Sequence, residues 1–219
     1  MLVLTAAVLI QPASACDVEP YSRDDVVFFG DSTTAHMKLR GGVDEARVWS
    51  GQANTVLFSS VNDICPVYFA DENRSLSLAD AVSEKRPAIL VITLGVSGGA
   101  GMVPEHKFKS IYKEMIDTVR SFSPDTVLFV QSILPLSDKS RKHFKLLTKE
   151  AVEEANGWIK QVCEDEDVCF IDTYPLLCDG DGYLKKIYQN DEYMHLTRRA
   201  YEVILDNVYK TVEENINRR

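Results

Sequence analysis

The stretch Ala88-Ile89-Leu90-Val91-Ile92-Thr93-Leu94 is nearly continuous in branched aliphatic side chains. A strand with one face in water alternates apolar and polar residues. An unbroken apolar run is instead typical of a parallel strand that helices cover on both faces. The stretch therefore predicts the central strand of a parallel sheet.

Four other apolar runs, rich in β-branched residues, are expected to complete this sheet. They are Val26 to Phe29, Ala46 to Trp49, Thr126 to Ser132 and Val168 to Ile171. A further short strand is predicted at Val67 to Ala70.

Amphipathic segments with a period of 3.6 residues separate these runs. The expected helices cover Leu76 to Lys85, Phe108 to Phe122, Arg141 to Asp165 and about Thr197 to Ile216. Strands that alternate with helices indicate an α/β fold, namely a three-layer α/β/α sandwich with a parallel sheet of about five strands. A single domain over residues 20–219 accounts for the whole pattern.

The charge balance limits the partners of the protein. The formal net charge is -9 over 219 residues. An acidic surface disfavours nucleic acid and anionic membranes. The cysteines form no C-x-x-C pair, so we predict no zinc site and no other metal.

The first sixteen residues differ from the rest of the chain. Leu2 to Ile10 is a short uncharged apolar run, and Ala13-Ser14-Ala15 matches the cleavage pattern of an export signal. Cys16 follows directly, which resembles a bacterial lipoprotein processing site where this cysteine would carry a lipid anchor. Residues 1–16 are therefore predicted to be a signal-peptide-like or lipoprotein leader of an extracellular or cell-surface protein. A hydrophobic first strand is the alternative.

Four cysteines remain beyond this segment: Cys65, Cys163, Cys169 and Cys178. An even number in an exported protein permits two disulfides, and Cys163 with Cys169 would close a small loop. Four reduced thiols are the alternative.

Gly30-Asp31-Ser32 directly follows the strand Val26 to Phe29. In parallel sheets the active site lies beyond the carboxyl ends of the strands. A tight turn there places the Ser32 hydroxyl near a helix N-terminus, whose free N–H groups can stabilise an oxyanion. The same triplet is also common turn chemistry, with Ser32 as a helix cap.

His195 lies near the far end of the chain and follows Asp191 and Glu192 by four and three residues. A serine hydroxyl needs a base to become a nucleophile at neutral pH, and the base needs an acid to fix its tautomer. His36, His106 and His143 lack such neighbours, so we interpret them as surface residues.

Together, these two segments resemble the SGNH (GDSL-type) hydrolase family, over Val26 to about Tyr209. The resemblance implies a flavodoxin-like α/β/α sandwich and ester hydrolysis without a metal or organic cofactor. It also implies that Ser32 is the nucleophile and His195 the base. The Asp-x-x-His register of the family favours Glu192 as the acid, whereas Asp191 has the usual residue type one position earlier.

The resemblance extends to the oxyanion hole, for which it implies the N–H groups of Ser32 and Gly51. The family's Gly-x-Asn-Asp block corresponds to Gly95-Val96-Ser97-Gly98, so Ser97 stands where the family has asparagine. A Ser97 hydroxyl can donate in place of the amide, with a shorter reach. The change can equally mark reduced activity, because loss of one oxyanion donor costs about a hundredfold or more in rate.

The leading hypothesis is a serine esterase that hydrolyses short-chain or O-acetyl esters, small or glycan-borne, through an acyl-enzyme. Two alternatives stay open. The chain can be a non-catalytic surface lipoprotein that binds a glycan or peptide, or an O-acyltransferase in which a sugar hydroxyl replaces water.

Overall fold

The computed structural model describes residues 22–217. Five parallel strands form one sheet in the order β2-β1-β5-β6-β7, and two antiparallel strands form a separate hairpin, β3-β4. The strands are β1 Val26–Gly30, β2 Val48–Trp49, β3 Val67–Phe69, β4 Arg74–Leu76, β5 Ile89–Thr93, β6 Val127–Gln131 and β7 Cys169–Ile171.

The helices connect these strands and cover the sheet. They are α1 Ser32–Ala35, α2 Leu78–Lys85, α3 Glu105–Phe122, α4 Lys149–Asp165, α5 Tyr174–Leu177 and α6 Arg198–Ile216. A π-helix spans Met37–Gly41, and short 3-10 turns span Arg23–Asp25, Glu45–Arg47, Phe58–Ser60, Ser140–Lys142 and Lys186–Tyr188. Within residues 22–217, no helix is long and apolar enough to cross a membrane.

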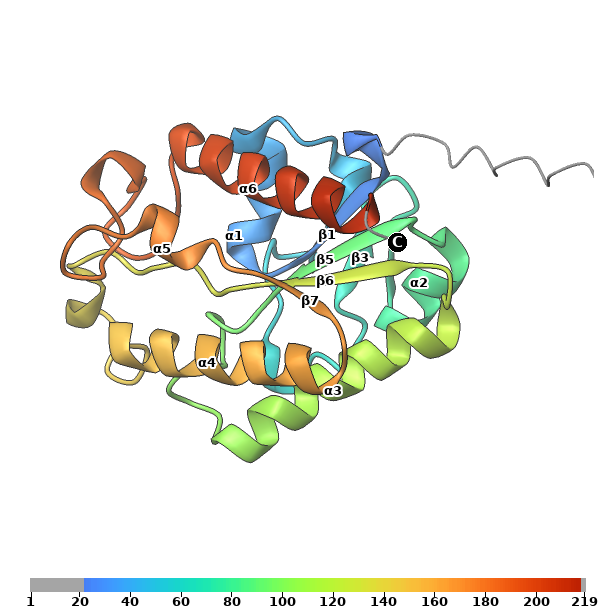
Figure 1. Ribbon diagram of the computed structural model, residues 1–219, viewed down its shortest axis with the longest axis horizontal. Helices are drawn as coiled ribbons and strands as arrows, with labels where there is room; N and C mark the ends of the chain where they lie inside the picture. Colours follow the sequence, from blue (N-terminus) through green and yellow to red (C-terminus); the bar gives the residue numbers. More distant parts are fainter. Residues whose placement is uncertain (1–21, 218–219) are drawn as a thin grey trace, which may run out of the picture.

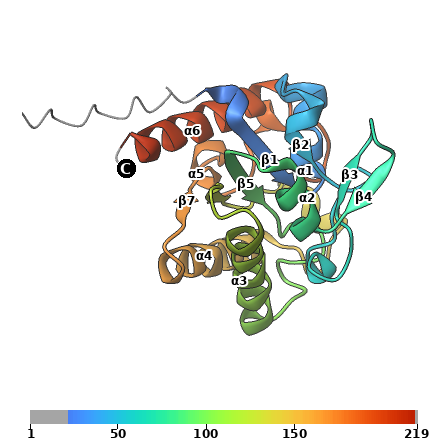
Figure 2. The ribbon, with the colours of Figure 1, turned by 90° about the vertical axis from the view of Figure 1, so that its right-hand side faces the viewer.

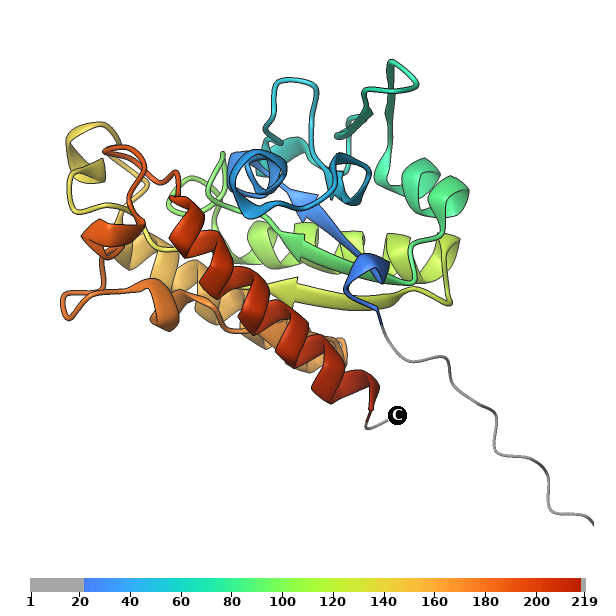
Figure 3. The ribbon, with the colours of Figure 1, turned by 90° about the horizontal axis from the view of Figure 1, so that it is seen from above.

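The molecule has three layers. Helices α3 and α4 lie side by side on one face of the sheet, and α6 crosses the other face (Figures 1 and 2). Figure 3 shows α6 running obliquely across the strands. The predicted α/β/α sandwich with a five-stranded parallel sheet is confirmed.

The alternation of side chains along β1 separates two hydrophobic cores. Phe28 packs into the core beneath α6, whereas Phe29 packs into the core shared with α2, α3 and α4. β5 is buried at all five positions, because both of its faces are covered. This is the physical origin of the unbroken apolar run in the sequence.

The helix expected from Arg141 begins eight residues later. Thr148 caps α4, because its hydroxyl accepts the N–H of Ala151 at 3.1 Å. Leu146, an apolar residue within the predicted range, is 60% exposed and precedes the cap. The apolar pattern in the sequence therefore extends beyond the start of α4, which the capping threonine sets.

The cysteines of the described chain do not show the proposed bridge. Cys163 is a free thiol buried in the core at the end of α4. A disulfide between Cys163 and Cys169 is therefore not formed in this structure. Residues 1–16, including Cys16, lie outside the described residues.

Candidate active site

Ser32 lies at the carboxyl end of β1, next to the centre of the sheet, and is partly exposed. The turn into α1 requires a glycine before it. A Cβ on Gly30 would lie 2.1 Å from Thr34 Oγ1 and 2.3 Å from the carbonyl oxygen of Thr93. The close approach of β1, β5 and α1 therefore fixes where Ser32 emerges.

Asp31 caps α1 and is almost fully buried, at 1% exposure. Its Oδ1 accepts the Thr33 N–H at 3.1 Å and the Thr33 hydroxyl at 3.0 Å. Burial raises the pKa of Asp31 to about 6, although hydrogen bonds from Thr33 and from the backbone of Ser97 and Val96 oppose the rise. Asp31 thus joins the nucleophile turn to the loop after β5.

His195 connects Ser32 to a carboxylate. The distance from His195 Nε2 to Ser32 Oγ is 3.2 Å, and His195 Nδ1 makes a short contact with Asp191 Oδ2. Both the His195 and Asp191 side chains are about three-quarters buried, with 28% and 24% exposure. A hydroxyl, an imidazole and a carboxylate in this order form the geometry of a Ser-His-Asp triad.

A local turn sets the position of His195. Asp191 Oδ1 accepts the N–H groups of Tyr193, Met194 and His195 at 2.8, 3.1 and 3.2 Å. Burial alone would raise the pKa of Asp191, but these bonds and the His195 ring outweigh it and hold the pKa below its ordinary value. The carboxylate therefore stays ionised opposite the imidazole.

The preference for Glu192 as the partner of His195 is wrong for this structure. The Glu192 side chain is 56% exposed and pairs with Lys139, which lowers its pKa. Ser137 holds the backbone of this turn, because its N–H donates to the Tyr193 carbonyl and its hydroxyl donates to the Glu192 carbonyl. With the backbone held there, the spacing of four places Asp191 under His195 and turns Glu192 outward.

Gly51 and Ser97, the other expected oxyanion residues, are brought together by Thr55. A Cβ on Gly51 would lie 2.2 Å from the Thr55 carbonyl oxygen, so that position has room only for glycine. Thr55 Oγ1 lies 3.4 Å from Ser97 Oγ. The Ser97 carbonyl accepts the Phe58 N–H at 2.8 Å, which ties the loop after β5 to the segment after β2.

His36 is not the simple surface residue that the sequence suggested. Its ring contacts the ring of His195 with centroids 4.6 Å apart and an interplanar angle of 57°. Its Nδ1 atom is buried and has no hydrogen-bond partner. Burial, His195 and Arg40 lower the pKa of His36, while Asp191 acts in the opposite direction. The position one turn after Ser32 was the available signal, since residues four apart share a helical side.

A family model described as the GDSL-like Lipase/Acylhydrolase family matches residues 28–203. The chain belongs to this family. The matched range includes the last three residues of β1, Ser32 and the turn with Asp191 and His195. No curated protein matches the chain by sequence.

Solved structures of other acylhydrolases have the same fold. A GDSL-like lipase from Bacteroides thetaiotaomicron is 16% identical, with a TM-score of 0.58 over 90% of this chain and 92% of that one. A carbohydrate esterase family 3 protein from Talaromyces cellulolyticus is 14% identical, with a TM-score of 0.59 over 89% and 98%. A lipase/acylhydrolase from Enterococcus faecalis is 17% identical, with a TM-score of 0.56 over 87% and 95%.

Proposed function

We propose that this acylhydrolase-family chain is a serine esterase that cleaves short-chain or O-acetyl esters through an acyl-enzyme. One observation carries the proposal: Ser32 Oγ, the His195 ring and the Asp191 carboxylate form a continuous chain of contacts. His195 Nε2 accepts the Ser32 proton as Oγ attacks the ester carbonyl, and Asp191 stabilises the resulting imidazolium. The imidazolium then protonates the leaving alcohol.

Deacylation repeats the same steps with water. His195 takes a proton from the water molecule as its oxygen attacks the acyl carbonyl, and returns that proton to Ser32 Oγ when the acid leaves. We assign the oxyanion of both steps to the N–H groups of Ser32 and Gly51 and to the Ser97 hydroxyl. The contact between Ser97 and Thr55 supports this assignment, because a hydroxyl that accepts from Thr55 keeps its own proton for donation.

We further propose that the ester is carried by a glycan. A structural neighbour with a carbohydrate esterase name supports this substrate class. The acidic chain also fits an uncharged polymer better than an anionic lipid surface.

The Ser32→Ala variant tests the nucleophile. We expect kcat for 4-nitrophenyl acetate to fall at least about a thousandfold, as for loss of other triad nucleophiles. Ser121→Ala, an exposed serine on α3, is the matched control and should keep wild-type turnover. Unchanged hydrolysis by Ser32→Ala would refute the assignment.

A fluorophosphonate probe separates an esterase from a non-catalytic binding protein. We expect covalent labelling of the wild type at Ser32 and none of Ser32→Ala. Product analysis with and without an added sugar acceptor separates hydrolysis from acyl transfer, because an acyltransferase would move the acyl group to the acceptor instead of releasing acetate.

We also propose that residues 1–16 direct export and that Cys16 is lipidated. The apolar run before Ala13-Ser14-Ala15 supports this proposal. Expression in a bacterium with labelled palmitate should give a labelled membrane-associated protein. Cys16→Ser should abolish the label, whereas Cys65→Ser, an exposed cysteine of the domain, should keep it.

A further inference from the structure

A hollow of about 210 Å³ opens beside the loop that follows β2. The end of α1 and the π-helix form one side of it, and β2, the loop after β2 and β3 form the other. Its lining includes Ala35, Lys38, Gly51, Gln52 and Tyr68. None of these side chains belongs to the Ser-His-Asp arrangement.

Two lining residues connect this hollow to the candidate active site. Ala35 is three positions after Ser32 on α1, so it lies on the same side of the helix, about 4.5 Å farther along the axis. Gly51 is the residue whose N–H we assign to the oxyanion. The hollow therefore adjoins the region into which an ester bound at Ser32 would extend.

The hollow is polar but carries no net charge. Among its described lining residues, the cation Lys38 is paired with the anion Glu45 at 2.6 Å. The other polar side chains are the amides of Gln52 and Asn54, the phenol of Tyr68 and the hydroxyl of Ser50. The last of these is buried without a hydrogen-bond partner, in a residue with only 7% exposure.

These groups favour one class of ligand. A phosphate or carboxylate would require an unpaired cation, and Lys38 is already neutralised. A fatty acyl chain would remove water from the polar groups without replacing their hydrogen bonds, which is unfavourable. A sugar ring is uncharged, and each of its hydroxyls both donates and accepts, as amides, phenols and hydroxyls require.

We infer that this hollow binds a sugar unit of a neutral polysaccharide whose ester is cleaved at Ser32. The inference rests on the proposed esterase function and names the substrate class of that same site. The sugar adjoining the scissile ester occupies the hollow, and the acyl group is held at Ser32 and the oxyanion residues.

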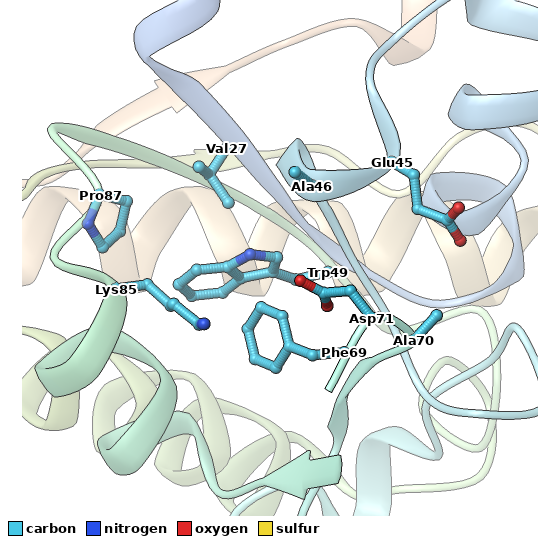
Figure 4. Close-up of a pocket in the computed structure, with 9 residues that line it drawn as sticks. All are labelled: Val27, Glu45, Ala46, Trp49, Phe69, Ala70, Asp71, Lys85 and Pro87. Carbon is cyan, nitrogen blue, oxygen red and sulfur yellow. The ribbon is translucent and has the colours of Figure 1, made fainter. Parts of the chain in front are cut away.

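A second hollow lies on the opposite face of β2, because Trp49 lines it whereas Val48 and Ser50 line the first. It measures about 390 Å³, and the two share Glu45 and Ala70 in their linings. Figure 4 shows the Trp49 and Phe69 rings next to each other in it, with Lys85 reaching toward them. The second hollow alone reaches the size of a typical ligand site, about 300–1,000 Å³. Because they lie on opposite faces of β2, the two hollows are separate, and the inferred sugar site is confined to the first.

The test compares two acetate esters: 4-nitrophenyl acetate and methyl 2-O-acetyl-β-D-xylopyranoside. Gln52→Ala removes an exposed amide of the first hollow. We expect its ratio of kcat/KM on the xyloside to kcat/KM on the aryl ester to fall about fivefold, as for one lost hydrogen bond. Gln161→Ala, an exposed glutamine on α4, is the matched control and should leave the ratio unchanged.

An unchanged ratio in Gln52→Ala, or a wild type that cleaves the aryl ester but not the xyloside, would overturn the sugar site. Failure of the esterase function itself is read separately, from Ser32→Ala on the aryl ester.

Discussion

The two segments that meet at the candidate active site are held in opposite ways. Ser32 follows an inner strand of the sheet, and the next three residues of α1 are buried. His195 ends a partly exposed turn that Asp191 shapes through three backbone hydrogen bonds. Packing in the core therefore fixes the position of Ser32, whereas one local carboxylate fixes the position of His195. The Ser32 segment should be sensitive to changes in packing, and His195 should be sensitive to the loss of a single charge.

Removal of the Asp191 charge should have the largest effect. Asp191→Asn keeps an Oδ1 acceptor for the turn but loses the charge opposite His195, so kcat on 4-nitrophenyl acetate should fall roughly 10³- to 10⁴-fold. Glu192→Gln is the matched control, because Glu192 faces Lys139 and solvent, and should remain within about twofold of wild type. A larger loss in Glu192→Gln than in Asp191→Asn would reverse the choice of acid.

Packing at the Ser32 segment is tested by Gly30→Ala. The new methyl would meet Thr34 and the backbone of Thr93 at 2.1 and 2.3 Å, so we expect the free energy of unfolding to fall by about 3 kcal/mol. Gly180→Ala has no atom within 4 Å of its added Cβ and should cost much less. Urea denaturation measures both. Equal stabilities of the two variants would mean that the core does not hold the Ser32 turn.

The buried carboxyl of Asp31 makes the stability of the folded protein depend on pH. In the unfolded chain its carboxyl ionises near 3.8, whereas in the folded protein it ionises near 6. The folded state therefore binds the proton more tightly, and the contribution of Asp31 to stability decreases as the pH rises from about 4 to about 6. At 1.36 kcal/mol per pH unit, the decrease is about 3 kcal/mol.

Asp31→Asn removes this ionisation. Compared with wild type, the variant should lose about 3 kcal/mol less stability between pH 4 and pH 7, as measured by urea unfolding at each pH. Asp125→Asn, an exposed aspartate after α3, should follow the wild-type profile. If the stability of Asp31→Asn changed with pH as the wild type does, the buried carboxyl would not be the cause of the pH dependence.

His36 should have the smallest effect, because it only packs against the base. A ring contact is worth about 1 kcal/mol, so His36→Ala should lower kcat about fivefold while KM changes little. His36→Phe keeps a ring and should recover most of the loss. Recovery by His36→Gln instead would show that hydrogen bonding, and not ring packing, positions His195.

The layers of the fold were predictable from local patterns. The unbroken run around β5 and the alternation of strands with helices indicated a covered parallel sheet, and the structure has one. The start of α4 was predicted eight residues too early, because the hydrophobic period continues through Leu146 while the chain turns at Thr148. A single capping bond decides such a boundary, and periodicity does not contain it.

By itself, the sequence determined the sheet, the family resemblance and the pairing of Ser32 with His195. These follow from short-range patterns and from the rule that strand carboxyl ends share one edge. Only the tertiary structure decided that Asp191 rather than Glu192 faces His195, that His36 packs on the base and that Thr55 lies between Gly51 and Ser97. The reason is physical: one residue of register reverses the direction of a side chain in a turn. Asp191 Oδ1 holds this turn through three N–H groups, and Ser137, distant in the sequence, also binds its backbone.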